Sequence, residues 1–136
     1  RFTLGKGQTL KEGSDVTIIS TGIMATAAIE AADALAKEGI SARVVNMASI
    51  KPIDEELIVK CAKETGAIVT VEDHSIIGGL GTAVSEVIAE TAPCILRRIG
   101  VRDVFGRSGK PADLFKYYHM TPDDIASSAR EAIKLK

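Results

Sequence analysis

The stretch AIVTVEDHSIIGGLGTAVSEVIAETAPCILRRIG, residues 67–100, predicts the fold of the chain. It begins with a β-rich run at 67–73 and passes through several glycines into a helical pattern at 80–91. Pro93 ends that pattern, and a second β-rich run follows at 94–100. Strand, helix, strand is the unit that builds a parallel sheet, because parallel neighbours need a long crossover connection.

The same unit occurs twice upstream. β-rich runs at 16–22 and 42–47 are each followed by a helical pattern, at 23–37 and at about 54–65. Apolar residues recur at helical spacing in the first of these patterns: Met24, Ala28, Ala31 and Leu35. Asp54 has the character of an N-cap for the second, and Gly66 ends it. We therefore expect an α/β fold with helices on both faces of a largely parallel sheet.

The two ends of the chain differ from this repeat. Residues 8–12 predict a short extra strand at an edge of the sheet, and the tight turn that follows makes it antiparallel, so the sheet is mixed. Residues 111–117 predict a short helix, and Thr121 with Asp124 forms the signature of a helix start. A last helix carries Ile125, Ala129 and Ile133. With no shift in composition, residues 1–136 are read as one domain.

Composition narrows the class of protein. The 136 residues are 46% hydrophobic, which is enough for a core, and 17 basic residues face 18 acidic ones for a net charge of −1. The charges are spread along the chain, so neither nucleic acid nor a membrane surface is expected as a partner. The chain lacks a signal-peptide pattern and an apolar run of roughly 20 residues, and a cytoplasmic location is expected. Cys61 and Cys94 have apolar neighbours and no metal-ligand spacing, which favours buried thiols.

Candidate functional residues gather where strands end, because ligands of parallel sheets bind beyond the carboxyl ends of the strands. They form an expected interface or regulatory crevice made of Thr21, Gly22, Asp73, His74, Gly78, Gly79, Gly81 and Arg102. The glycines have two interpretations. They expose backbone amides at a helix start to an anion, or they let the helix pack tightly on a strand, and we favour packing.

His74 is the strongest candidate for acid–base chemistry, with Glu72 on the same side of the strand. No nucleophile accompanies it, since Ser75 is its neighbour in the chain and no Gly-x-Ser-x-Gly elbow occurs. We therefore favour a histidine that ends a strand or contacts another subunit, and no residue is assigned as catalytic, cofactor-binding or metal-binding. Among the arginines, Arg97 and Arg98 fit the charges that protect an edge strand, while a phosphate-binding role stays open for those at 102 and 107.

Four segments in order, KEGSDVTIISTG, EGISARVVNMASIKPID, ETGAIVTVEDHSIIGGLGTAVSEV and RIGVRDVFGRSGKPADLFKYYHMT, closely resemble the carboxyl-terminal domain of the transketolase family. The resemblance covers nearly the whole chain, and VEDHSIIGGLG and GVRDVFGRSG are its most specific parts. IKPID is shared with deoxyxylulose-phosphate synthase, and the general layout extends to the β subunits of 2-oxo acid dehydrogenases.

This resemblance implies a three-layer α/β/α fold with a five-stranded mixed sheet and one antiparallel edge strand. It also implies an enzyme that moves a two-carbon ketol unit between phosphosugars, using thiamine diphosphate and a divalent metal. In such enzymes other domains hold the cofactor, partly through a Gly-Asp-Gly motif that these 136 residues lack. The isolated domain is expected to be inactive and to extend the interface of a homodimer. Its partners are then the other transketolase domains or an N-terminal subunit.

Two alternatives remain beside this interpretation. The chain is the corresponding domain of deoxyxylulose-phosphate synthase, or a stand-alone binding or regulatory module that kept the fold. The pair Asp73-His74 argues against the synthase, which usually has Glu-Asn there. The start at Arg1, without a methionine, suggests a domain excised from a longer chain.

Overall fold

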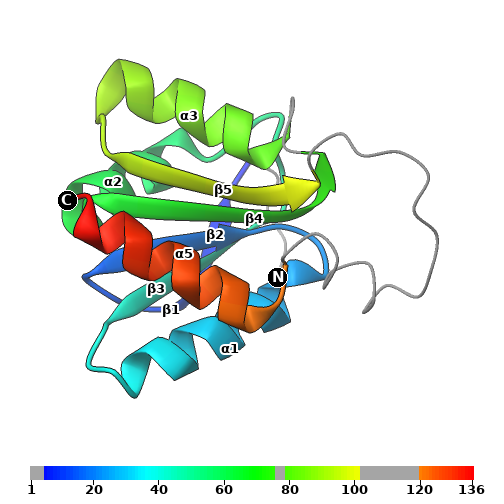
Figure 1. The fold of residues 1–136 in the computed structure, drawn as a ribbon. Coiled ribbons are helices and arrows are strands. Elements are labelled where there is room, and N and C mark those ends of the chain that lie inside the picture. The colour runs from blue at the N-terminus through cyan, green and yellow to red at the C-terminus, as the bar shows by residue number, and fades with distance from the viewer. Residues whose placement is uncertain (1–4, 76–78, 102–119) are drawn as a thin grey trace.

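The structure is a computed structural model that describes residues 5–75, 79–101 and 120–136, with the side chains of 73–75 and 101 outside that description. Strands and helices alternate along most of the chain (Figure 1). The elements are β1 (Gly7–Lys11), β2 (Val16–Ser20), α1 (Met24–Ala36), β3 (Ala42–Met47), α2 (Glu55–Thr65), β4 (Ala67–Ser75), α3 (Leu80–Thr91), β5 (Ile95–Val101) and α5 (Pro122–Lys134).

The five strands form one mixed sheet in the order β1-β3-β2-β4-β5. Strands β2, β3, β4 and β5 run parallel, and β1 pairs antiparallel with β3 at one edge, with Gln8 opposite Asn46. The predicted mixed sheet with an antiparallel edge strand is confirmed. Although β1 and β2 are consecutive in the sequence, β3 lies between them.

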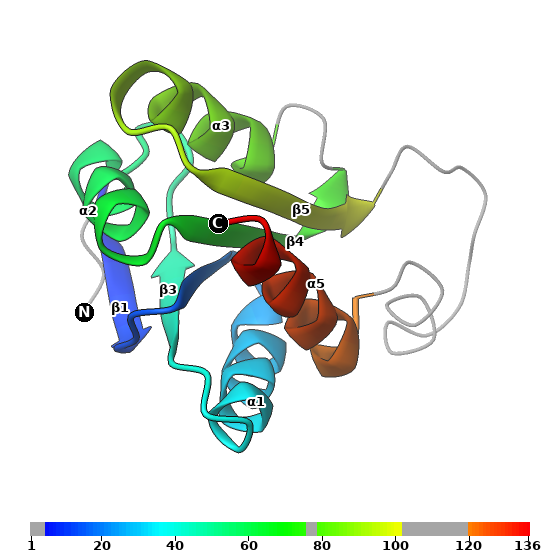
Figure 2. The same cartoon turned by 60° about the vertical axis from the view of Figure 1, so that its left-hand side comes forward.

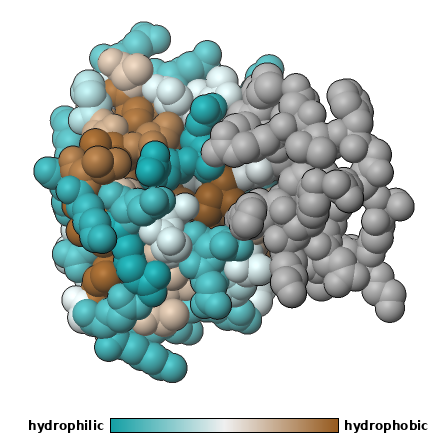
Figure 3. Space-filling model, in the orientation of Figure 1, coloured by the Kyte–Doolittle hydropathy of each residue, from teal (hydrophilic) through white to brown (hydrophobic). Residues whose placement is uncertain are grey.

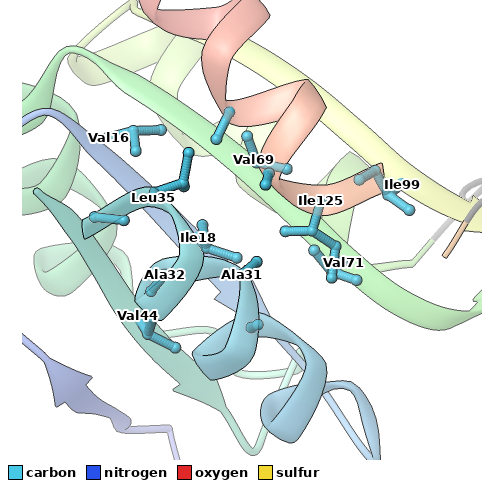
Figure 4. Close-up of a cluster of buried hydrophobic side chains, with 14 of the residues drawn as sticks. Val16, Ile18, Ala31, Ala32, Leu35, Val44, Val69, Val71, Ile99 and Ile125 are labelled. Carbon is cyan, nitrogen blue, oxygen red and sulfur yellow. The ribbon is translucent and has the colours of Figure 1, made fainter. Parts of the chain in front are cut away.

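Helices cover both faces of the sheet, which makes three layers (Figure 2). Helices α1 and α5 pack on one face, where the buried cluster of Figure 4 joins Ile18, Leu35, Val69 and Ile125. Helices α2 and α3 lie side by side on the opposite face, over a second cluster. Side chains of a strand alternate between faces, so neighbouring residues of β4 belong to different clusters: Val69 to the first and Ile68 to the second.

Local signals in the sequence start α2 and α5, and end α2, as predicted. The Asp54 carboxylate accepts a hydrogen bond from the Leu57 backbone N at 3.2 Å, and Gly66 ends α2 with φ of 73°. At the start of α5, the Thr121 hydroxyl accepts from the Asp124 backbone N, and the Asp124 carboxylate accepts from the Thr121 backbone N. Such reciprocal bonds satisfy donors that a helix start otherwise leaves without partners.

Three details differ from the sequence prediction or lie beyond it. Strand β4 continues two residues beyond the predicted run at 67–73 and ends at Ser75, which pairs with Val101. The helical pattern at 80–91 predicts an inner face of Ala83, Val84, Val87 and Ile88, but Ala83 is half-buried and lines a surface groove. The helix predicted at 111–117 lies outside the described residues.

The connections define where a crevice would lie. From β2 the chain crosses through α1 to β3 on one side, and from β4 it crosses through α3 to β5 on the other. The carboxyl ends of the adjacent strands β2 and β4 therefore flank the point where the connections diverge. The residues predicted at the ends of β2 and β4 do lie near one another, at the side of the sheet where the carboxyl ends of the parallel strands gather.

The surface is mainly polar on the face shown in Figure 3, where apolar residues form separate patches between hydrophilic ones. Exposed large apolar side chains among the described residues are Leu10, Ile23 and Leu135. In the same part of the chain, no helix combines the length and the apolar character needed to cross a bilayer.

Val84→Asp tests the placement of the inner face of α3. Val84 is fully buried among apolar residues, so a carboxylate there would be desolvated without a partner. We expect a loss of about 3–5 kcal/mol in the free energy of unfolding, measured by urea denaturation. Ala89→Asp, on the exposed side of the same helix, is the matched control and should cost less than about 1 kcal/mol. Equal stability of the two variants would contradict the placement.

Candidate functional site

The central feature of the strand-end region is a buried carboxylate. Glu72 of β4 is 1% exposed, and its two oxygens accept hydrogen bonds from the first backbone amides of α3. Oε2 accepts from the Leu80 N at 2.8 Å, and Oε1 accepts from the Gly81 N at 3.1 Å. The chain thus supplies its own anion to the start of this helix.

The local sequence explains why α3 needs this partner. Gly79 occupies the N-cap position, where it offers no side-chain oxygen, and the first turn of α3 has no acidic residue. Glu72 shares a face of β4 with Ile68 and Thr70, so its side chain reaches the layer that contains α3. A helix start carries partial positive charge and free N–H donors, which together stabilise a buried carboxylate.

The Leu80 and Gly81 backbone amides are therefore not free to bind an external anion. The anion-binding interpretation of the glycines is wrong for these two amides, because the Glu72 carboxylate already occupies them. Packing is the confirmed interpretation at Gly81. A Cβ there would lie 2.8 Å from Arg98 Cδ and 3.1 Å from Thr70 Oγ1, closer than van der Waals contact allows.

Thr21 and Gly22 lie at the end of β2, as predicted. The Thr21 backbone N donates to the Val71 carbonyl at 3.2 Å, which extends the pairing of β2 with β4 by one residue. Gly22 then turns the chain toward α1 with φ of 60°, a conformation that favours glycine. The Thr21 hydroxyl is buried and has no hydrogen-bond partner in the described part of the chain.

The remaining predicted residues are only partly placed. The backbones of Asp73 and His74 belong to β4, beside the end of β2, while their side chains lie outside the described residues. Gly78 and Arg102 also lie outside them, as does Arg107. The structure thus brings part of the predicted set to the side of the sheet where the parallel strands end: Thr21, Gly22, Gly79, Gly81 and the 73–75 backbone. The role of this crevice stays a prediction.

The arginines of β5 fit a structural role. β5 is an edge strand, which is where charged side chains hinder pairing with other chains. Arg97 is exposed, and its Nη2 lies 3.6 Å from Glu131 Oε1 of α5. The stem of Arg98 lies over Gly81, where it packs against the start of α3.

Sequence reasoning missed a second buried charged residue, Arg43 of β3. Its Nη2 lies 2.7 Å from Glu64, its Nε donates to the Gly13 carbonyl at 3.1 Å, and its Nη1 donates to Cys61 Sγ at 3.7 Å. Burial acts to lower the pKa of Arg43, but the hydrogen bonds to Cys61 and Glu64 outweigh it and the pKa is raised. An arginine inside the run ARVVNM was the available signal.

Neither cysteine forms a disulfide. Cys61 is fully buried and Cys94 is half-buried, and both are free thiols. Burial raises the pKa of the Cys94 thiol, and the electrostatic interaction with Cys61 adds to this effect, so the reactive thiolate form of Cys94 is disfavoured. Within residues 5–75, 79–101 and 120–136, no three His, Cys, Asp or Glu residues are grouped as metal ligands.

Comparison with known proteins gives the chain a family context. The sequence model of the family "Transketolase, C-terminal domain" matches residues 5–125. A 6-deoxy-6-sulfo-D-fructose transketolase subunit of Clostridium sp. (strain MSTE9) is 47% identical over 135 residues, which cover 99% of this chain and 42% of the relative. A 1-deoxy-D-xylulose-5-phosphate synthase of Heliobacterium modesticaldum is 47% identical over 129 residues, which cover 94% of this chain and 20% of the synthase.

A solved structure agrees with these relatives. The chain superposes with a TM-score of 0.96 on a structure described as a split gene transketolase, inactive β4 tetramer. The two are 53% identical, and the match covers all of this chain and 45% of the other. The chain thus spans less than half the length of the relatives it matches.

Glu72→Gln tests the buried cap of α3. A glutamine side chain keeps the shape of glutamate, but it has one oxygen and no charge, so at most one of the two amides keeps its acceptor. We expect a loss of about 1.5–3 kcal/mol in the free energy of unfolding, measured by urea denaturation. Glu86→Gln, exposed on the same helix, should stay within about 0.5 kcal/mol of the unaltered chain. Unchanged stability of Glu72→Gln would show that the carboxylate does not hold this helix.

Proposed function

Because the chain belongs to the family of transketolase C-terminal domains, we propose that it is the carboxyl-terminal part of a thiamine-diphosphate-dependent transketolase. The complete enzyme moves a two-carbon ketol unit between phosphosugars in the cytoplasm. The observation that carries this proposal is the family match over residues 5–125 in a chain less than half as long as its relatives. The sugars stay open, since one relative is named for a sulfosugar.

The residues of this chain do not fit the cofactor that the proposal requires. The chain has no Gly-Asp-Gly motif, and its described residues contain no cluster of metal ligands. The helix start best suited to a diphosphate, that of α3, is occupied by the Glu72 carboxylate. Thiamine diphosphate and its metal are thus assigned to other parts of the enzyme, and no chemical step is derived through this domain.

In this proposal the domain contributes to assembly and not to chemistry. Glu72 holds the start of α3, Gly81 lets that helix lie close to the sheet, and both shape the edge where β2 and β4 end. The strand-end residues form an interface or regulatory crevice in the assembled enzyme: Thr21, Gly22, Asp73, His74, Gly78, Gly79, Gly81 and Arg102. Its partners are the other transketolase domains or an N-terminal subunit, in a homodimer of the complete enzyme.

The synthase branch is the second candidate, and the match to the Heliobacterium enzyme favours it. The pair Asp73-His74 favours the transketolase branch instead. A stand-alone binding module of the same fold is the third candidate.

The native polypeptide separates these candidates. We would capture from cells the chain that carries VEDHSIIGGLG, measure its intact mass, and assay the captured assembly for two-carbon transfer from a ketose phosphate to an aldose phosphate with added thiamine diphosphate and Mg²⁺. A chain about twice as long that carries out the transfer supports the proposal. Condensation of pyruvate with glyceraldehyde 3-phosphate would assign the synthase. A native chain of this length with neither activity would favour the binding module.

His74→Ala tests the assignment of this histidine to assembly. In the complete enzyme we expect a weaker dimer, measured by sedimentation at graded concentrations, with the rate of the chemical step nearly unchanged. A general acid or base contributes a factor of roughly 10²–10⁴ to a rate. A thousandfold loss of turnover with an intact dimer would therefore contradict the assignment and make His74 catalytic.

A further inference from the structure

One hydrogen-bond donor at the start of α3 is unused. The Thr70 side chain is 1% exposed, and its hydroxyl has no hydrogen-bond partner in the described part of the chain. Its Oγ1 lies 3.1 Å from the position that a Cβ would take at Gly81, the residue whose backbone N donates to Glu72. A buried hydroxyl without a partner is costly, so this one marks a place where an acceptor is still wanted.

The attachment of Glu72 to the sheet explains why its carboxylate leaves this hydroxyl unused. Thr70 and Glu72 are two residues apart on the same face of β4, which separates their backbones by about 6–7 Å. The Glu72 side chain extends to α3, where its oxygens accept from the Leu80 and Gly81 amides. A carboxylate has about four acceptor positions, so room for a further donor remains. A carboxylate that is not attached to β4 can move toward Thr70 and still keep both amides.

The space that Glu72 fills matches a small carboxylate. Beyond its Cβ, a glutamate side chain consists of one methylene and one carboxylate, which have the same heavy atoms as acetate. The variant Glu72→Ala removes those atoms and leaves the Leu80 and Gly81 amides without their acceptors. Because Arg98 and Thr70 already lie against Gly81, α3 has little room to move inward and fill the space.

We propose that the start of α3 is a binding site for a small carboxylate, which the chain fills with Glu72 and which accepts free acetate when that side chain is truncated. Its donors are the Leu80 and Gly81 backbone amides and the Thr70 hydroxyl, and the partial positive charge of the helix start favours an anion. Glu72 is therefore a built-in ligand that keeps the site closed to external anions. The site does not depend on the proposed enzymatic activity, because all of its groups belong to this domain.

Hydrogen exchange at the start of α3 in the complete native protein tests this site. Glu72→Ala should speed exchange of the first α3 amides, and acetate should slow it again. At ten times its Kd, acetate should slow exchange about tenfold, because binding reduces the open fraction by the factor 1 + [acetate]/Kd. Sodium chloride at equal ionic strength and acetamide, which has the shape of acetate without its charge, should have little effect.

Two variants separate a built site from a general effect of the anion. Thr70→Val in the unaltered protein should leave exchange unchanged, since its hydroxyl has no partner there. Added to Glu72→Ala, it should weaken acetate binding about tenfold, as expected for losing a hydrogen bond to a charged group. Val84→Ala, which leaves an apolar space under the same helix, is the matched control, and acetate should not slow its exchange.

Three results would overturn the proposal. They are no slowing by acetate in Glu72→Ala, equal slowing in Val84→Ala, and an acetate affinity that Thr70→Val does not change. If Glu72→Ala unfolds this domain in chloride, exchange protection that returns in acetate supports the site, and protection that stays absent contradicts it.

Discussion

The Glu72 carboxylate and the first amides of α3 form the contact on which the strand-end region depends. A buried carboxylate alone would be strongly disfavoured, and so would two buried amides without acceptors. Here the Leu80 and Gly81 backbone amides donate to the Glu72 carboxylate oxygens at 2.8 and 3.1 Å, so that the carboxylate and both amides have hydrogen-bond partners. The contact ties β4, in the interior of the sheet, to the helix that covers it.

This contact also changes how the glycine-rich segment is interpreted. Glycines before a helix are the usual setting of a phosphate site, because backbone amides point at the anion. In this protein the anion is part of the chain, and Gly81 is small because Arg98 and Thr70 lie against it. At Gly81 the segment therefore serves the packing of α3 on the sheet.

Much of the fold could be predicted because its signals are local. Asp54 and Thr121 cap helices within three residues of themselves, Gly66 ends α2, and the apolar spacing placed Met24 and Leu35 in the core. Less of the site could be predicted. Glu72 and Arg43 pair with residues of other elements, and the sequence signals this only indirectly. Each is a charged residue in an apolar strand, and the helix that Glu72 contacts has no side-chain cap of its own.

The sequence by itself determined the α/β class, the strand and helix order, and the antiparallel character of β1, because hydrophobic period, caps and turn length are properties of neighbouring residues. Only the tertiary structure decided that β3 separates β1 from β2, that Ala83 faces a groove, and that Glu72 occupies the amides of α3. Those outcomes depend on which elements pack together. Packing joins residues far apart in the chain, and the chemistry of a buried charge is determined by the partner it meets there.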